Sequence, residues 1–355
     1  MKIALLAPAV SPHAVKWANM FQKRGNSVTV FSLPEDKPDD LLYDAGISVN
    51  YLDVKAADDG LRINAKNLKH MISAGGFDVV NAFGANTYGV LAMNAKQKYL
   101  LTITGLDMYA AEGADKAICS KVIKKAAAVC CPTNAAMQKA MALIKNKPKE
   151  YFVVTPGIDL YKFDIKEGMR EEGVVTFGCI KALEELSGID VLLDAYKEMK
   201  GQTEAKTRLI IIGEGSKENE LRHQAAKLGI ESEVEFKGYV PNDKLPDEIN
   251  RMNALVNPSR YEMLGVSTLE GMACGVPTIA TDTDGSSEII LNGVTGYTVK
   301  NGNLSALVYR LKEFAEYPQN AAKMGTKTRG DVEDYYEINA CTEKYMKALE
   351  FASKK

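Results

Sequence analysis

Short apolar segments that alternate with amphipathic ones set the strongest limit on the fold of this chain. Residues 2–8 form a nearly continuous apolar run, residues 14–25 carry a helical pattern that ends at a glycine, and residues 28–32 are apolar again. Such runs indicate buried parallel strands joined by helices. The alternation continues to residue 131 and returns from residue 174 onwards. The sequence therefore predicts a doubly wound α/β protein.

The length of 355 residues suits two domains rather than one. The segment T-P-G-I-D at residues 155–159 has the composition of a turn or linker, so we expect a boundary near residue 160. The expected domains are residues 1–160 and residues 161–331, followed by a helical pattern in residues 332–355. Four apolar residues are expected to form the docking face of that last helix: Tyr335, Ile338, Tyr345 and Leu349.

Composition excludes several classes of function. The six cysteines are scattered without a C-x2-C pair, so neither a zinc site nor a disulfide framework is indicated. No apolar run reaches eighteen residues, so no membrane span is predicted. The formal charge of −2 gives little support to nucleic-acid binding. The apolar N-terminus is shorter than a signal peptide requires, and we interpret it as the first strand of a cytoplasmic protein.

Charge is distributed unevenly along the chain. Residues 1–160 carry an excess of Lys and Arg, and the rest of the chain carries an excess of Asp and Glu. A basic helix in the first domain could contact anionic lipid headgroups at a membrane surface; the simpler interpretation is a solvated surface. The lysines of this helix are Lys116, Lys121, Lys124 and Lys125.

The stretch from residue 257 to residue 299 contains the strongest functional pattern. Gly265 follows a short apolar strand and a polar turn and opens a helix, and the free backbone amides of a helix start bind anions. Glu262 stands before this helix and Glu270 lies inside it, with seven residues between them. Carboxylates accept hydrogen bonds from sugar and ribose hydroxyls, whereas a diphosphate only accepts them. The pattern predicts a nucleotide-sugar site.

This stretch resembles the donor-site signature of retaining glycosyltransferases of family 4, which have the two-domain GT-B fold. The resemblance implies that Glu262 contacts the donor sugar and Glu270 the ribose. It also implies that the terminal helix crosses back to the first domain. The residues implied to surround the donor phosphates are Met263, Leu264, Gly265, Val266 and Ser267, where the family usually has Phe at the position of Leu264.

The family's phosphate-binding loop is altered in this chain. Its pattern is G-R-L-x3-K-G, whereas this sequence reads G-C-I-K-A-L-E-E-L-S-G from Gly178. Cys179 occupies the place of the Arg, and Ser187 occupies the place of the Lys. Lys181, three residues past Gly178, is the expected replacement; the alternative is a solvated loop lysine.

Further candidates come from three loops. The segment E-F-K-G-Y-V-P resembles the one that seats the nucleobase through backbone groups, which implies Gly238, Tyr239 and Val240. In the first domain, Asp107 would orient the acceptor or act as its base, unless it is only a helix N-cap. His13 is a candidate catalytic residue in the loop after the first strand, or simply a residue of a helix start.

The resemblance implies a metal-independent, retaining hexosyltransferase without a cofactor. It would move a hexosyl or N-acetylhexosaminyl group from a nucleotide sugar, expected to be UDP-linked, to a glycan or lipid-linked acceptor in bacterial polysaccharide synthesis. Its expected location is the cytoplasm, at the inner face of the membrane. Two alternatives remain open: a non-catalytic GT-B protein that binds a sugar nucleotide or a partner enzyme, and a sugar-nucleotide epimerase of similar fold.

Overall fold

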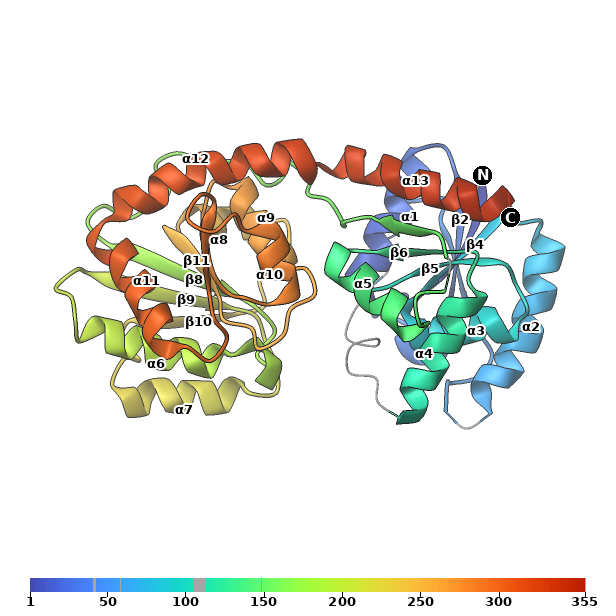
Figure 1. Ribbon diagram of the computed structural model, residues 1–355, viewed down its shortest axis with the longest axis horizontal. Helices are drawn as coiled ribbons and strands as arrows, with labels where there is room; N and C mark the ends of the chain where they lie inside the picture. The colour runs from blue at the N-terminus through green and yellow to red at the C-terminus, as the bar shows by residue number, and fades with distance from the viewer. Residues whose placement is uncertain (41–42, 58, 105–112, 148, 355) are drawn as a thin grey trace. The chain divides into compact units, whose positions relative to one another are not determined.

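The computed structural model describes residues 1–40, 43–57, 59–104, 113–147 and 149–354. The chain forms two compact units (Figure 1). Unit 1 contains Met1–Pro156 and Asn339–Lys355, and unit 2 contains Gly157–Ile338. The sequence analysis expected boundaries near residues 160 and 331.

Unit 1 is built on a seven-stranded parallel sheet with the order β3-β2-β1-β4-β5-β6-β7. Its strands are β1 (Lys2–Leu6), β2 (Ser27–Ser32), β3 (Ser48–Tyr51), β4 (Val79–Phe83), β5 (Tyr99–Thr102), β6 (Ala128–Cys131) and β7 (Tyr151–Val153). Its helices and helical turns are α1 (Pro12–Lys23), η1 (Pro34–Asp36), α2 (Gly60–Gly75), η2 (Gly84–Tyr88), α3 (Gly89–Asn94), α4 (Gly113–Lys125), α5 (Asn134–Leu143) and α13 (Ile338–Lys354). The inner strands β4, β5 and β6 are wholly buried and β1 is nearly so, as the apolar runs predicted, whereas the edge strands β3 and β7 are only partly covered.

Unit 2 repeats the arrangement with a six-stranded parallel sheet, in the order β10-β9-β8-β11-β12-β13. Its strands are β8 (Val175–Ile180), β9 (Thr207–Ile212), β10 (Val234–Gly238), β11 (Ala254–Asn257), β12 (Thr278–Thr281) and β13 (Gly296–Val299). Its helices and helical turns are η3 (Glu185–Ser187), α6 (Ile189–Lys200), α7 (Glu218–Leu228), α8 (Leu245–Asn250), α9 (Val266–Ala273), α10 (Asp284–Ile289), α11 (Leu304–Glu316) and α12 (Pro318–Tyr335). Two parallel sheets with interleaved helices confirm the doubly wound α/β prediction.

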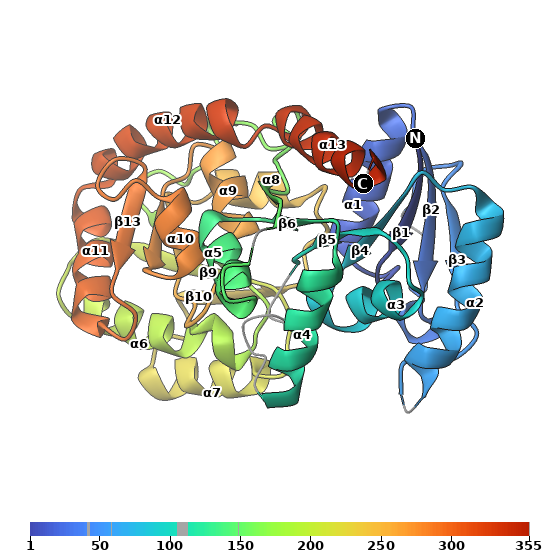
Figure 2. The same cartoon turned by 45° about the vertical axis from the view of Figure 1, so that its right-hand side comes forward.

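The last helix, α13, completes the core of unit 1. Figure 2 shows α13 beside α1, and the ring of Tyr345 meets the Trp17 ring edge-on with 4.5 Å between centroids. The buried Tyr345 hydroxyl accepts a hydrogen bond from Asn81 Nδ2 at 2.8 Å. Leu349 is also buried, as expected for a docking residue. Tyr335 is not, because it lies on α12 with 62% of its surface exposed.

The expected continuous helix from residue 332 onwards is instead divided between α12 and α13. The backbone bonds at the break explain the division. Ile158 N donates to the carbonyl of Tyr336 at 2.7 Å, and Ile338 N donates to the carbonyl of Ile158 at 3.0 Å. The backbone at this point therefore pairs with a distant extended segment, and α13 begins anew at Ile338.

Candidate functional site

The amino end of α9 lies where the sequence predicted an anion site. β11 ends at Asn257 and α9 begins at Val266, with Gly265 as its N-cap. Gly265 has φ of +83°, which favours glycine, and an added Cβ would stand 3.3 Å from Thr268 Oγ1. The first backbone N–H groups of a helix have no acceptor within it. Those of Val266 and Ser267 are therefore suited to a ligand's oxygen atoms.

Glu262 is held beside this helix start by an ion pair with Lys181. The two side chains are only 14% and 17% exposed, with Lys181 the less exposed. Oxygen Oε2 of Glu262 also accepts from Asn257 Nδ2 at 3.3 Å and from Ser259 Oγ at 3.4 Å. One cation and two neutral donors thus surround a single carboxylate oxygen.

The sheet order explains why Lys181 and Glu262 meet. Lys181 follows β8 directly, and Glu262 lies in the loop after β11. β8 and β11 are neighbouring parallel strands, so their carboxyl ends reach the same edge of the sheet. Both residues were predicted from the sequence, but their ion pair and the contacts of Asn257 and Ser259 could not be seen in it.

Glu270 occupies the second turn of α9 and is buried, with 9% of its surface exposed. Asn242 Nδ2 lies 3.4 Å from its Oε1 atom. Burial of this carboxylate separates it from an ordinary solvated helix residue. The sequence analysis did not single out Asn242, although it lies two residues past Val240, in the segment assigned to the nucleobase.

Cys179 and Ser187, where this chain departs from the family pattern, both have structural roles. Cys179 is fully buried in β8, and this burial raises the pKa of its thiol to about 12. Ser187 Oγ donates to the carbonyl of Ala182 at 2.5 Å. Gly178 lies inside β8, where an added Cβ would stand 2.0 Å from Met252 Sδ. Gly178 is therefore needed for core packing, whatever its relation to a ligand.

A second glycine-rich loop, which the sequence analysis missed, packs against the Lys181 loop. It reads G-E-G-S from Gly213 and follows β9. An added Cβ at Gly213 would stand 1.9 Å from the Lys181 carbonyl oxygen, and one at Gly215 would stand 2.4 Å from that of Leu183. Only glycines permit this approach. The signal in the sequence was a G-x-G directly after a buried strand.

Glu214 from this loop supports the segment assigned to the nucleobase. Its Oε1 atom accepts from Tyr239 N at 3.1 Å, and Gly213 N donates to the carbonyl of Gly238 at 2.9 Å. Gly238 has φ of +68°, and the Tyr239 side chain is 68% exposed. Val240 is partly buried. The backbone of this segment is therefore fixed while the Tyr239 ring faces solvent.

Arg260 fixes the loop between β11 and α9. Its Nη1 and Nη2 atoms donate to the two carboxylate oxygens of Asp190 at 2.8 and 2.5 Å, and Nη1 also donates to the carbonyl of Glu185. Burial acts to raise the pKa of Asp190, but the hydrogen bonds and charge of Arg260 prevail and hold it below its ordinary value. The Arg260 guanidinium is therefore bound to Asp190, in the first turn of α6.

The first-domain candidates are less informative. His13 lies in the first turn of α1 and is partly buried. Burial lowers the pKa of its imidazole, and the charge of Lys16 lowers it further. Asp107 lies outside the described residues. Within the described ranges, no group of three or more His, Cys, Asp or Glu side chains is arranged to hold a metal ion. No helix among those residues is both long and apolar enough to cross a membrane.

Two family models match the chain. The model described as glycosyl transferases group 1 matches residues 162–331, and the model described as glycosyl transferase 4-like matches residues 2–133. With two Rossmann-like sheets, these matches define a glycosyltransferase of the GT-B fold. The chain belongs to the family 4-like glycosyltransferases, which confirms the resemblance seen in the sequence.

The sequences of two related proteins match part of this chain. An uncharacterised glycosyltransferase of Methanocaldococcus jannaschii is 27% identical over 272 residues, which cover 71% of this chain and 69% of that protein. A GDP-mannose-dependent α-(1-6)-phosphatidylinositol monomannoside mannosyltransferase of Mycolicibacterium smegmatis is 30% identical over 191 residues. That match covers 49% of each chain, so this chain spans about half the length of the mannosyltransferase.

Solved structures match over nearly the whole length. Sucrose-phosphate synthase from Thermosynechococcus elongatus superimposes with a TM-score of 0.84 at 17% identity, covering 99% of this chain and 98% of that one. The Anabaena protein HepE in complex with UDP-glucose gives a TM-score of 0.83 at 17% identity, covering 99% of each chain. At such identity the likeness is one of fold.

Proposed function

We propose that this protein is a retaining glycosyltransferase that moves a hexosyl or N-acetylhexosaminyl group from a UDP-sugar to a glycan or glycolipid acceptor. The observation that carries the proposal is the ion pair of Lys181 and Glu262 beside the amino end of α9. This arrangement offers a cation and helix amides for a diphosphate and a carboxylate for sugar hydroxyls.

In this proposal the donor lies along α9. The backbone N–H groups of Gly265, Val266 and Ser267 hold the diphosphate, with Met263 and Leu264 beside it. Glu270 accepts from the ribose hydroxyls, and Glu262 accepts from the donor sugar. The backbone of the segment formed by residues 238–240 seats the base. The UDP-glucose complex of HepE, a protein of the same fold, supports a UDP-linked donor, whereas the mycobacterial relative is GDP-mannose-dependent.

The reaction breaks the bond between C1 of the donor sugar and the β-phosphate oxygen and forms a bond between C1 and the acceptor oxygen on the same face. The acceptor proton passes to the departing phosphate oxygen or to a base, for which Asp107 and His13 are the candidates. The transition state carries positive charge on the sugar and growing negative charge on the phosphate. Lys181 would stabilise that negative charge, and Gly178 would border the same loop. No metal or cofactor takes part in this scheme.

The proposed acceptor is a glycan or lipid-linked sugar at the inner face of the membrane. Its support is the basic surface of α4, where Lys116, Lys121 and Lys124 are exposed. Lysines placed in this way bind anionic headgroups through charge. Binding of the full chain to vesicles should then require anionic lipid and should weaken with added salt.

A second candidate function is a non-catalytic protein that binds sugar nucleotides. Burial of Cys179 and the bond from Ser187 to the backbone favour it, because neither position supplies a cation. Both functions predict binding of a sugar nucleotide, but only the transferase predicts its turnover.

Release of free nucleotide from UDP-glucose, UDP-galactose, UDP-N-acetylglucosamine and GDP-mannose by the full chain tests the proposal. We expect one UDP-sugar to be turned over and the anomeric configuration to be retained in the product. Glu270→Ala should weaken UDP binding by about 1.5–3 kcal/mol, since a bond to a charged acceptor is lost. Glu262→Gln should lower turnover more than UDP binding. Binding of a UDP-sugar without turnover, in the presence of neutral and lipid-linked sugars, would favour the binding protein.

A further inference from the structure

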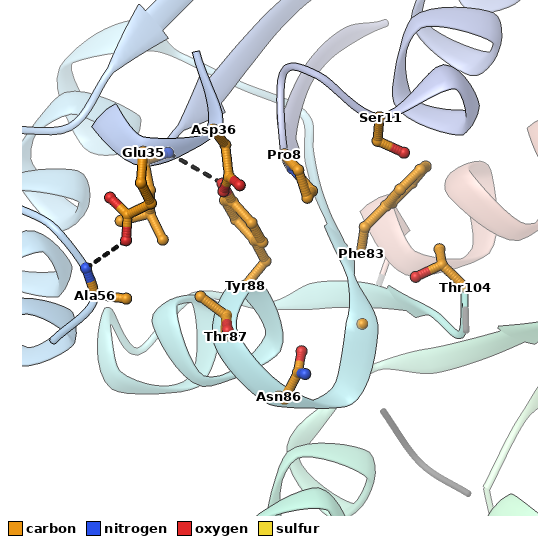
Figure 3. A pocket seen from close by; sticks show the side chains of 12 residues that line it. Pro8, Ser11, Glu35, Asp36, Ala56, Phe83, Asn86, Thr87, Tyr88 and Thr104 are labelled. Atoms are coloured by element: carbon orange, nitrogen blue, oxygen red, sulfur yellow. Dashed lines mark hydrogen bonds between the residues drawn. The ribbon is translucent and has the colours of Figure 1, made fainter. Parts of the chain in front are cut away.

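Unit 1 contains a pocket of about 450 Å³ at the carboxyl ends of β1, β2 and β4 (Figure 3). β1 lies between β2 and β4, which is the point where the strand order of the sheet reverses. Open parallel sheets bind ligands at this point. The volume also lies within the range of about 300–1,000 Å³ that is usual for small-molecule sites. The lining residues are Pro8, Ser11, Leu33, Glu35, Asp36, Ala56, Phe83, Gly84, Asn86, Thr87, Tyr88 and Thr104.

A π-helical turn, η2, shapes one wall of the pocket. It begins at Gly84, whose φ is +83°, and Asn86 departs from helical backbone angles inside it. Such turns are often found at functional sites. Here the turn directs the Tyr88 side chain towards Asp36, as Figure 3 shows.

Tyr88 holds the Asp36 carboxylate in place. The buried Tyr88 hydroxyl accepts from Leu33 N at 3.0 Å and donates to Asp36 Oδ2 at 2.5 Å. Burial raises the pKa of the Tyr88 phenol, and its hydrogen bond to Asp36 raises it further, so the hydroxyl stays protonated and remains a donor. Asp36 Oδ2 is therefore occupied by the protein itself.

The neighbouring carboxylate is fixed in a similar way. Glu35 Oε1 accepts from Ala56 N at 2.7 Å. Within the part of the chain that the structure describes, these bonds use one oxygen of Glu35 and one of Asp36. The second oxygen of each carboxylate is left for donors from a ligand. Two positioned acceptors thus face one pocket.

The remaining lining suits a sugar. Pro8, Leu33 and Phe83 offer apolar surface, while Ser11 and Asn86 add short polar groups. Among the described lining residues there is neither a lysine nor an arginine, so nothing there offsets the two acidic side chains. A ligand group with negative charge would be repelled, whereas hydroxyl and ammonium groups can donate to the carboxylates.

We propose that this pocket takes the terminal sugar of the acceptor, and that it selects a neutral or amino sugar over one that carries a phosphate or a carboxylate. The assignment of the bound sugar as the acceptor rests on the proposed transferase function, whereas the selectivity of the pocket does not. Glu35 and Asp36 determine this selectivity, and Tyr88 positions Asp36.

Ligand-detected NMR on the full chain at pH 7.5 tests the selectivity with four probes: methyl α-glucoside, glucosamine, glucuronate and glucose 6-phosphate. The first two should bind the wild type, and the two anions should bind at least about tenfold more weakly because of the carboxylates. Glu35→Lys should reverse this order, since the side chain is exposed and its replacement by a cation should be tolerated. Asp36→Asn, a smaller change, should reduce the preference without reversing it.

Asp39→Lys provides the matched control. Asp39 is exposed, lies three residues past Asp36 and does not line the pocket. Asp39→Lys changes the charge by the same amount as Glu35→Lys, but outside the pocket. The selectivity of this variant should therefore match that of the wild type. An equal effect of both substitutions would attribute the preference to general surface charge and overturn the proposal. Equal binding of anionic and neutral probes by the wild type would also overturn it.

Nucleotide release measured on the same samples separates this proposal from the proposed function. Turnover of a UDP-sugar together with a failure of methyl α-glucoside and glucosamine to bind would overturn the pocket assignment and leave the transferase intact. If the chain shows the expected selectivity but binds no sugar nucleotide, the proposed selectivity of the pocket stands. Only the assignment of its ligand as the acceptor of a transferase is then lost.

Discussion

Lys181 and Glu262 form an ion pair between the loops that follow two neighbouring strands of unit 2. Both side chains are largely buried, so neither charge is well hydrated. A diphosphate that engages Lys181 must compete with Glu262 for it. In the part of the chain that the structure describes, removal of Lys181 leaves the Glu262 carboxylate with two neutral donors, Asn257 and Ser259.

Lys181→Ala should lower kcat by about a hundredfold or more, because the lost cation acts on charge that develops as the phosphate leaves. The Kd for UDP should change less, by under about tenfold, since the helix amides remain. Steady-state kinetics with the preferred UDP-sugar and calorimetry with UDP measure the two effects. Lys227→Ala, at an exposed lysine of α7, is the control. Near-native kinetics for Lys181→Ala would leave Lys181 as a structural partner of Glu262 without a role in the reaction.

Cys179→Arg introduces the residue that the family pattern has at this position, and we expect it to destabilise the protein rather than to restore a phosphate contact. Cys179 is fully buried in the core of unit 2, so a guanidinium there would be unpaired and dehydrated. The free energy of unfolding should fall by at least about 3 kcal/mol. Denaturant unfolding of Cys179→Arg beside Cys179→Ala measures this loss. A stable arginine variant with raised turnover would contradict the expectation.

Gly285→Ala should weaken donor binding through the loop that carries Glu262. Gly285 lies in α10, where its N–H donates to the Glu262 carbonyl at 3.0 Å, and an added Cβ would stand 2.4 Å from Leu264 N. The loop would have to move, and we expect roughly a tenfold loss of UDP affinity from the misplaced amides.

Gly330→Ala is the matched control for this substitution. Gly330 lies in α12, and nothing stands within 4 Å of an added Cβ. Because alanine favours helices over glycine, neither change should lower stability through helix propensity. Equal UDP affinity of the Gly285 variant and the wild type, measured by calorimetry, would show that the loop does not set the phosphate site.

His13 gives unit 1 a pH-dependent stability. Its pKa in the folded protein is lowered from 6.5 by burial and by Lys16, so the unfolded chain binds the proton more readily. The resulting stability is fully present above pH about 6.5 and is lost as the pH falls towards the folded value. His13→Gln should therefore lose less stability than the wild type between pH 7 and pH 5. Thermal unfolding across this range measures the difference, with His70→Gln, at an exposed site on α2, as the control.

The two sheets could be predicted because parallel strands buried on both faces appear as continuous apolar runs. The position of Glu262 and Glu270 at the start of one helix could be predicted because both lie on one local loop and helix. Their partners could not, since Lys181 reaches Glu262 only through the pairing of β8 with β11. The strand register likewise decided that Cys179 points into the core.

The division between α12 and α13 could not be predicted from the sequence pattern either. Residues around Tyr336 carry no proline or glycine that would end a helix. The break depends on backbone hydrogen bonds to Ile158, which come from a segment far away in the chain. Helical periodicity reports only local spacing, and here a tertiary contact prevailed over it.

The position of Tyr345 in the core of unit 1 has a consequence for biosynthesis. Trp17 and Phe21 precede unit 2 in the chain, yet the ring that packs against both of them comes from α13, after the whole of unit 2. During translation the aromatic surface of Trp17 and Phe21 therefore stays uncovered by α13 until unit 2 has been synthesised. Unit 2 has no such dependence, so it can reach its final packing before the domain that precedes it in the chain.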